Sequence, residues 1–519
     1  MIRLHATLLG AVAAGVLAGP VSAAETLRLA EGTEHTSIDP HYWSGFPNVQ
    51  LGLTIFGHLV NFDSKYRLAP GLATSWKAID DKTWEFKLRD TKWHDGTPFT
   101  ADDVIFTFER APDAGLKQFA NYIRGKTITK IDDRTIHIKT PTPSPTVPND
   151  MAAFAIVSKK HGDAKTEDYN SGKAAVGIGP YKFVEWVKGD RLVLEANPNY
   201  WGGKPVFDRV IKKPIVSGPS RVASLLAGEV DMIDKVPPAD ISRLKKDAKL
   251  NIVQTPSCRV MYFAPDVSQD LSPFVKTNDG KPYWTNPFRD WRVRKALTKA
   301  IDRQGIVDRV LDGNAVAASQ HFGAGLFGHN PNIPVEPYDP EGAKKLLQQA
   351  GYGDGFQLTI HGTNDRYDND GQILEAVAQM LTRVGIKTEV GAMPAAIFFT
   401  RNTKQEFSAT IAGNCAGTAE AGAPLKEYVH TAEPSRGLGI YNRHGYSNYR
   451  LDKLIEDAIA VIDDAKREKL YQEALKAAMD DVAIIPLHQQ VNTWALRKGF
   501  TYEARTDEMT LPAYANKSN

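Results

Sequence analysis

The segment from residue 356 to residue 390 constrains the fold most, because it alternates the two kinds of regular structure. Residues 356–360, Phe-Gln-Leu-Thr-Ile, alternate apolar and polar side chains, as a strand does. Residues 373–384 have the periodicity of an amphipathic helix that Gly385 ends, and residues 386–390 are a second strand. A strand, a helix and a strand in succession predict parallel strands in an α/β lobe.

The N-terminus has the pattern of a secretory signal peptide. Arg3 gives a positive start, the residues from Ala6 to Ala18 form a short apolar run, and Pro20 ends it ahead of small residues. We expect cleavage before Ala24 or Glu25. A membrane anchor is the alternative, but the run is too short to span a bilayer. Because no cysteine lies near the cleavage site, we expect a soluble periplasmic protein without a lipid anchor.

Composition narrows the class of partner. The 519 residues suffice for two or three domains with sizeable cores. The formal net charge is only +2, which argues against a nucleic-acid-binding protein and against an acidic interaction tail. We therefore expect a partner other than nucleic acid.

The two cysteines, Cys258 and Cys415, leave two interpretations open. An oxidising compartment would allow them to pair, but the sequence does not supply the Cα distance that a disulfide needs. Two buried free thiols are the simpler expectation.

The stretch from Leu68 to Phe108 predicts a compact unit made of a strand, a turn and a helix. It begins with an apolar turn at residues 68–72, and residues 83–88 alternate as a half-buried strand does. Thr100 is expected to cap a helix, with Asp103 completing an acidic capping box. The side chains expected in its core are Trp84, Phe86, Leu88, Trp93, Phe99, Val104 and Phe108.

Catalytic motifs are missing from the sequence. It has no Gly-x-Ser-x-Gly, no phosphate-binding loop with Lys-Ser/Thr, no His-Glu-x-x-His and no Cys-x-x-Cys. The thirteen histidines are spread out, and the near pairs His35 with His41 and His430 with His444 are more simply ordinary polar residues. We therefore expect no enzyme, no cofactor and no metal site.

Three irregular stretches have the composition of a site for a small solute, with aromatic side chains and hydrogen-bonding groups. They are residues 35–43, residues 413–420 after a predicted strand, and residues 441–448. A flexible surface turn and a capped turn before a helix are the alternatives for the second and third. The candidate ligand-binding residues are His35, Asp39, His41, Tyr42, Trp43, Asn414, Cys415, Thr418, Glu420, Tyr441, Asn442 and Arg443.

Long motifs in the same order as in a known family extend along nearly the whole chain. Besides residues 68–108, they are Gly177–Phe183, Asn197–Pro205, Gly228–Ile233 and the basic run Phe288–Arg303. Together they resemble the extracellular solute-binding proteins of family 5, the peptide, dipeptide and nickel type. Ile178 stands where threonine is usual in the family.

The resemblance implies an α/β periplasmic-binding-protein fold of type II, with two lobes, a hinge and an inserted accessory subdomain. Lobe I would comprise residues 24–60, 177–255 and 485–519, the accessory subdomain residues 61–176, and lobe II residues 256–484. The resemblance also implies a monomer that captures a peptide or peptide-like solute and delivers it to the permease of an ABC importer.

The sequence departs from its relatives where peptide-binding members carry Gly-Trp followed by an aspartate that takes the peptide amino group. Here the matching residues are Gly413 and Asn414, and Glu420 is the only acid in that loop. An opine, a sugar or amino-acid conjugate or a nickel chelate therefore remains an alternative solute. A secreted hydrolase is the alternative from another class of protein.

Overall fold

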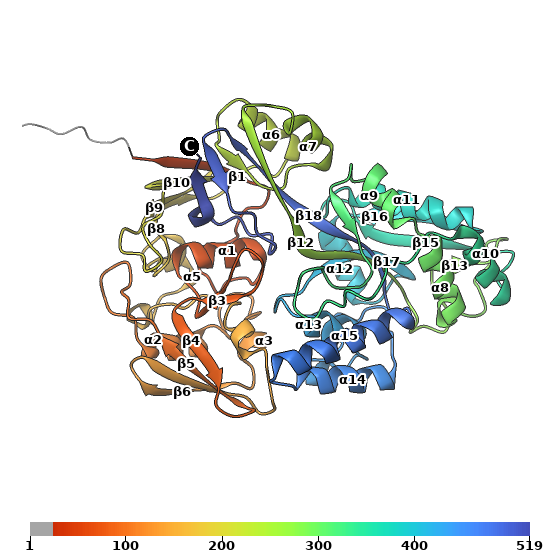
Figure 1. Ribbon diagram of the computed structural model, residues 1–519, viewed down its shortest axis with the longest axis horizontal. Helices are drawn as coiled ribbons and strands as arrows, with labels where there is room; N and C mark the ends of the chain where they lie inside the picture. Colours follow the sequence, from red (N-terminus) through yellow and green to blue (C-terminus); the bar gives the residue numbers. More distant parts are fainter. Residues whose placement is uncertain (1–23, 519) are drawn as a thin grey trace, which may run out of the picture.

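The computed structural model describes residues 24–518, and two lobes lie side by side in it (Figure 1). The signal peptide predicted for the N-terminus lies outside the described residues. Within residues 24–518, the structure has no helix that combines the length and apolar character needed to cross a membrane.

One twelve-stranded sheet runs through both lobes. Its lobe I part contains β1 (Thr26–Glu31), β8 (Tyr181–Val187), β9 (Arg191–Ala196), β10 (Arg209–Pro214) and β11 (Met232–Ile233). Its lobe II part contains β13 (Val275–Lys276), β14 (Ala315–Ala317), β15 (Phe356–Thr363), β16 (Ile386–Met393) and β17 (Ala409–Cys415). The two parts are joined by the long strands β12 (Leu250–Pro265) and β18 (Ile485–Arg497), which run diagonally between the lobes in Figure 1.

The antiparallel ladder of β12 and β18 is interrupted near its middle. Leu250 pairs with Arg497 at the lobe I end, and Phe263 pairs with Ile485 at the lobe II end. Between them the register shifts from Pro256 to Val260. Such an irregularity bends a strand locally, and it lies where the sheet passes from one lobe to the other.

Lobe II has the parallel strands that the sequence predicts. β15 pairs with β16 in parallel register, and α11 (Asp370–Arg383) makes the crossover between them. The apolar stripe of α11 is buried against the sheet, as its periodicity predicts. It consists of Ile373, Leu374, Val377 and Leu381.

The accessory subdomain is built on an antiparallel sheet in the order β4 (Ala73–Ala78), β5 (Thr83–Leu88), β7 (Thr135–Lys139) and β6 (Thr127–Asp132). The helix α2 (Ala101–Arg110) begins with the predicted capping box of Thr100 and Asp103. The predicted core is confirmed: six of its members are buried, namely Phe86, Leu88, Trp93, Phe99, Val104 and Phe108, and Trp84 packs against them partly buried.

Two local predictions are wrong. The apolar turn expected at the start of the segment Leu68–Phe108 is instead a short strand. Its residues Leu68–Pro70 form β3, which pairs with β2 (Val60–Phe62). Pro141, Pro143, Pro145 and Pro148 predict an extended, non-helical segment, but Val147–Asp150 forms one helical turn. Pro148 lies at the start of that turn, where proline is tolerated because the first amides have no intrahelical acceptor.

Cys258 and Cys415 form a disulfide, so the expectation of two free thiols is wrong. Cys258 lies on β12, and Cys415 lies on the neighbouring antiparallel strand β17. Their Cα atoms are 4.9 Å apart, within the range that a disulfide bridges. The pairing depends on a contact between strands that are distant in sequence.

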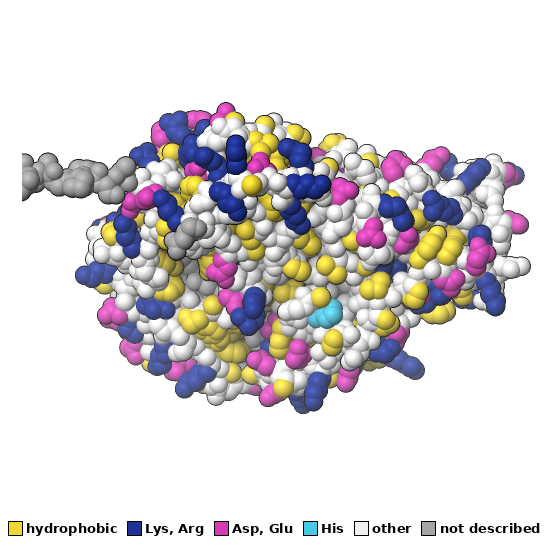
Figure 2. Space-filling view, turned by 45° about the horizontal axis from the view of Figure 1, so that its top comes forward, with side chains coloured by type: hydrophobic (Ala, Val, Ile, Leu, Met, Phe, Trp, Pro, Cys, Tyr) yellow, Lys and Arg dark blue, Asp and Glu magenta, His cyan; other side chains and the backbone are white. Residues whose placement is uncertain are grey.

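Charged side chains of both signs are mixed over the face that Figure 2 shows. Basic side chains gather toward its top, over α7 (Pro238–Leu244) and the residues after it, with acidic ones among them. The exposed basic residues of this segment are Arg243, Lys245, Lys246 and Lys249. This face therefore carries no continuous field of one sign.

Candidate functional site

A pocket lies where the two lobes meet, and we call it the interlobe pocket. Its wall comes from the residues after β11, from β12 and β18, from the loop after β15 and from the C-terminal segment. Together with its open mouth, the pocket has a volume of about 620 Å³. Its lining residues are Asp234, Lys235, Val236, Arg259, Arg366, Tyr367, Asp368, Gln490, Val491, Asn492, Thr493, Trp494 and Glu508.

Two charged groups of the interlobe pocket neutralise each other. The guanidinium of Arg259 donates two hydrogen bonds to the Glu508 carboxylate, from Nε at 2.8 Å and from Nη2 at 2.7 Å. The Ser257 hydroxyl donates to the same carboxylate at 2.8 Å. Burial alone would raise the pKa of Glu508, but Arg259 holds it below its usual value. The pair stays ionised and adds no net charge to the pocket.

Three other charged groups form no salt bridge among the described residues. Lys235 donates from Nζ to the Thr33 hydroxyl at 2.9 Å, and its charge also acts on the Asp368 and Glu508 carboxylates. Among the described residues, neither the Arg366 guanidinium nor the Asp368 carboxylate has a hydrogen-bond or ion-pair partner. Burial raises the pKa of Asp368 to about 6, although Lys235 opposes the shift. The interlobe pocket thus offers two positive charges and one negative charge to a solute.

The backbone at Lys235 is strained. Its φ is 45°, in the left-handed region that a lysine rarely adopts. Glu508, on the opposite wall, has a φ of 66°. Strained residues of this kind persist where the surrounding structure holds them, and they cluster at binding sites. Their presence in the interlobe pocket agrees with a functional role for it.

Gly413 lies behind Tyr367, which lines the interlobe pocket. The Tyr367 hydroxyl donates to its carbonyl oxygen at 3.2 Å. A Cβ atom at Gly413 would lie 2.5 Å from the Met261 sulfur and 3.0 Å from the Tyr367 ring. Glycine at this position is therefore needed for the packing of Tyr367.

A series of tyrosine rings continues from Tyr367 along lobe II. The ring of Tyr262 lies 5.9 Å from that of Tyr428, which lies 5.4 Å from that of Tyr441. The Arg443 guanidinium lies 5.9 Å from the centre of the Tyr441 ring. Burial, and next the neighbouring Tyr367, raise the pKa of Tyr262. Aromatic walls of this kind are typical of solute pockets.

The predicted stretch at residues 35–43 lies largely inside lobe I. Asp39 is fully buried and accepts hydrogen bonds from Arg110 at 2.7 Å and from Thr166 at 2.9 Å. His41 is also fully buried, and its Nε2 lies 2.7 Å from the Ala155 carbonyl oxygen. Both side chains already have structural partners.

The other members of that stretch are also outside the interlobe pocket. His35 is buried against Trp186, with ring centres 5.2 Å apart, and Tyr42 and Trp43 are half-buried. A second hollow between the lobes, about 500 Å³ with its mouth, begins just after them at Ser44. A ligand role for His35, Asp39, His41, Tyr42 and Trp43 stays a prediction.

The predicted residues from Asn414 to Glu420 are mostly engaged in structure. Asn414 and Cys415 belong to β17, and Cys415 is in the disulfide. Glu420 is buried and accepts hydrogen bonds from Arg467 at 3.0 and 3.2 Å. The hydroxyl oxygen of Thr418 is buried without a hydrogen-bond partner among the described residues. A ligand role for these four residues also stays a prediction.

In the third predicted stretch, Tyr441 is 45% exposed and Arg443 is half-buried, so both side chains remain open to a ligand. Asn442 is buried, and its amide donates to the carbonyl oxygens of His430 and Tyr446 at 2.9 and 2.7 Å. Tyr441 and Arg443 therefore lie beside the tyrosine series, whereas Asn442 shapes the loop. Their contact with a solute stays a prediction.

Sequence reasoning missed Lys235 and Asp368, and it did not retain Arg366 among the candidate ligand-binding residues. A usable signal was present for two of them, because residues 366–368 follow β15 at the carboxyl end of a parallel strand. In open α/β sheets, ligands bind in crevices at that edge. Lys235 lies in the turn after β11, and nothing in its local sequence distinguishes it from a surface lysine.

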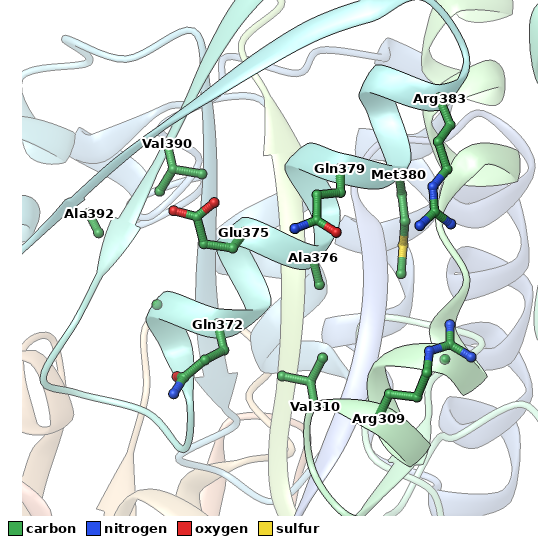
Figure 3. A pocket seen from close by; sticks show the side chains of 12 residues that line it. Arg309, Val310, Gln372, Glu375, Ala376, Gln379, Met380, Arg383, Val390 and Ala392 are labelled. Atoms are coloured by element: carbon green, nitrogen blue, oxygen red, sulfur yellow. The ribbon is translucent and has the colours of Figure 1, made fainter.

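A hollow within lobe II is a different feature from the interlobe pocket. It lies between α9 (Arg303–Arg309), α11 and β16, all within lobe II. Arg309 and Arg383 lie at one end of it, and Gln372 and Glu375 lie at the other (Figure 3). Because a single lobe forms it, closure of the lobes does not enclose it.

Among the described residues, His430, Glu433 and Glu456 form a group of potential metal ligands. Arg436 already occupies the space, since its Nη1 lies 2.9 Å from Glu433 and 3.0 Å from Glu456. The guanidinium supplies the positive charge that the two carboxylates need. His444 does not belong to this group.

Two lobes joined by paired strands, with a charged pocket between them, define a two-lobed solute-binding protein. The chain belongs to family 5 of the bacterial extracellular solute-binding proteins: the model of that family's middle region matches residues 67–435. The resemblance carried by the sequence motifs is thereby confirmed.

Relatives of known name agree with this assignment. Over 473 residues, the chain is 29% identical to the glutathione-binding protein GsiB of Pectobacterium atrosepticum, covering 89% of this chain and 88% of that protein. It is 28% identical to the periplasmic oligopeptide-binding protein OppA of Escherichia coli, covering 93% and 90% of the two chains. The fold is similar to that of HbpA2 from Haemophilus parasuis, with a TM-score of 0.81 and 24% identity over 95% of this chain and 100% of that one.

Proposed function

We propose that this protein is the periplasmic substrate-binding component of an ABC importer, and that it captures a small peptide or peptide-like polar solute between its lobes. The observation that carries the proposal is the interlobe pocket, where Lys235, Arg366 and Asp368 line the wall and form no salt bridge among the described residues. A peptide-like solute bears an ammonium and a carboxylate, which complement these groups. Relatives that bind oligopeptides and glutathione support this class of solute.

The binding cycle follows from the arrangement of the lobes. Lobe I contributes Lys235, and lobe II contributes Arg366 and Asp368, so a solute that spans the pocket stabilises the closed form. The closed monomer would then dock on the permease. In this proposal, lobe I comprises residues 24–60, 177–255 and 485–519, the accessory subdomain residues 61–176, and lobe II residues 256–484. The protein acts by binding and not as an enzyme.

A thermal-shift screen of the mature protein tests the proposal. The panel contains di- and tripeptides, glutathione, opines, sugars and Ni²⁺ with histidine. A solute at 100 times its Kd adds about 2.7 kcal/mol of stability. Stabilisation by a peptide or by glutathione is the expected result. Stabilisation by another class alone would replace the peptide assignment, and turnover of an ester or peptide without any stabilisation would contradict the transport proposal.

Lys235→Gln and Asp368→Asn are each expected to weaken binding of the best peptide by roughly 1–3 kcal/mol, because each removes a charged hydrogen-bond partner of the solute. Isothermal titration calorimetry of the purified variants measures the effect. The matched controls are Lys387→Gln and Asp308→Asn, exposed residues of lobe II outside the interlobe pocket. Equal affinities in all four variants would place the solute elsewhere.

A further inference from the structure

The hollow between the lobes that begins at Ser44 has mostly apolar walls, and we call it the second hollow. It measures about 500 Å³ with its mouth. Lobe I, the accessory subdomain and the loop after β17 of lobe II all contribute to it. Its larger apolar and aromatic side chains include Phe46, Val49, Leu53, Phe62, Tyr66 and Met509.

One face of α1 (Phe46–Ile55) is left partly uncovered in the second hollow. Phe46, Val49 and Leu53 follow one another at spacings of three and four residues, so they lie on one side of the helix. Each of them is half-buried, whereas Leu51 and Ile55 on the opposite side are buried in lobe I. An apolar group of a solute that covers this face would be removed from water together with it.

Arg505 gives the second hollow a hydrogen-bond donor that is not in use. The residue lines the hollow and is buried. Its Nε donates to the Asp507 carboxylate at 3.0 Å, and its Nη2 donates to the same carboxylate and to the Phe62 carbonyl oxygen. Its Nη1 is buried and has no hydrogen-bond partner among the described residues. A buried donor without an acceptor costs free energy, so an acceptor placed in the hollow would relieve that cost.

The walls of the second hollow carry no net charge. Among the described residues that line it, Arg505 and Asp507 are the charged ones, and they form an ion pair in which each side chain is 1% exposed. A charged group of a solute would lose its water here without gaining a counter-ion. The second hollow therefore favours an uncharged group, unlike the interlobe pocket.

Lobe II borders the second hollow through a residue that leaves room. The Tyr66 hydroxyl of the accessory subdomain donates to the Ala416 carbonyl oxygen at 2.9 Å, which holds the loop after β17 beside the hollow. Gly417 follows in that loop, is exposed and lines the hollow. A Cβ atom at Gly417 would have the Tyr122 hydroxyl as its nearest neighbour, 3.9 Å away. The mouth of the hollow is therefore open at this glycine.

One segment of the chain separates the second hollow from the interlobe pocket. Arg505, Asp507 and Met509 line the second hollow, whereas Glu508 lines the interlobe pocket. The charged groups of the pocket and the apolar space thus lie on the two sides of a single segment.

We propose that the second hollow is a subsite for an uncharged, apolar residue of the solute. The side chain of that residue packs on the uncovered face of α1, and its carbonyl oxygen accepts a hydrogen bond from Arg505 Nη1. The inference deepens the proposed function and rests on it, since it assumes that a solute occupies the space between the lobes. Among peptide-like solutes, it selects those with an apolar side chain.

Matched tripeptides test the subsite by isothermal titration calorimetry on the mature protein. The panel contains Ala-Ala-Ala and its variants with leucine, lysine or glutamate at each position. At one position, leucine should bind the wild type about tenfold tighter or more than alanine, because its larger side chain is removed from water. Lysine and glutamate at that position should bind no tighter than alanine. Equal affinities for leucine and alanine at every position would overturn the subsite.

Gly417→Leu places an apolar side chain at the mouth of the second hollow and should reduce the preference for leucine to about twofold. The matched control is Gly353→Leu, at an exposed glycine of lobe II outside the hollow, which should keep the preference. An unchanged preference in Gly417→Leu would overturn the subsite while leaving the proposed function intact.

Arg505→Lys tests the hydrogen bond, because lysine keeps a positive charge beside Asp507 but has a single terminal nitrogen. The variant should bind the preferred leucine peptide about tenfold more weakly. Its melting temperature without solute separates this loss from a loss of folding. Wild-type affinity in Arg505→Lys would overturn the assigned hydrogen bond, and if the variant does not fold, Gly417→Leu decides.

If no tripeptide binds the wild type, the peptide assignment of the proposed function fails, and the subsite is judged with uncharged probes. N-acetyl-leucine amide should raise the melting temperature of the wild type more than N-acetyl-glycine amide does, and Gly417→Leu should remove the difference. Equal shifts of the wild type by the two probes would overturn the subsite.

Discussion

We expect that replacing Cys258 and Cys415 by serine lowers the free energy of unfolding by roughly 2–5 kcal/mol. The disulfide closes a loop of 157 residues that contains most of lobe II. A cross-link over so long a loop removes much of the conformational freedom of the unfolded chain. It also fastens β12 to β17 next to the point where the ladder of β12 and β18 is interrupted.

Denaturant unfolding of the oxidised wild type, the reduced wild type and the double serine variant measures this effect. The reduced wild type and the variant should lose the same stability, because both lack only the cross-link. A loss below about 1 kcal/mol in both would mean that the β12–β17 ladder restrains the chain without the disulfide.

Glu420→Ala is expected to lower the free energy of unfolding by about 3–5 kcal/mol, because it leaves the Arg467 charge buried without its main partner. The two side chains are 8% and 4% exposed, and the Tyr471 hydroxyl donates to the same carboxylate at 3.3 Å. Arg467 also lies 5.0 Å from the centre of the Phe327 ring, so it is packed in place. Chemical denaturation gives the loss in free energy.

The same variant separates the two roles considered for Glu420. If the residue is structural, the folded fraction of Glu420→Ala binds the solute with wild-type affinity. A loss of affinity by about 1–3 kcal/mol with little loss of stability would return Glu420 to the ligand site. Glu420→Gln serves as the milder comparison, because it keeps the shape of the side chain and removes its charge.

The regular elements could be predicted from the sequence because their signals are local. The capping box of Thr100 and Asp103 lies within four residues, and the stripe of α11 repeats every turn. The short strand β3 was missed because Leu68–Pro70 reads as a turn until β2 is present to pair with it. The disulfide was missed for the same reason, since the β12–β17 register decides it.

The candidate site was harder to predict, because the role of a charged side chain depends on what faces it. Asp39 and Glu420 have the same chemistry as Asp368, but Arg110 and Arg467 neutralise the first two. Asp368 has no such partner, and Lys235 reaches its neighbourhood from a segment far away in the sequence. Only the folded chain shows which acids are already paired and which remain for a solute.

A crystal structure of the mature protein with the best solute from the screen tests the central claim most directly. We predict that the solute lies between the lobes, with its carboxylate within hydrogen-bond distance of Lys235 or Arg366 and its cationic group at Asp368. A solute bound on one lobe alone, for instance between α9, α11 and β16, would contradict it.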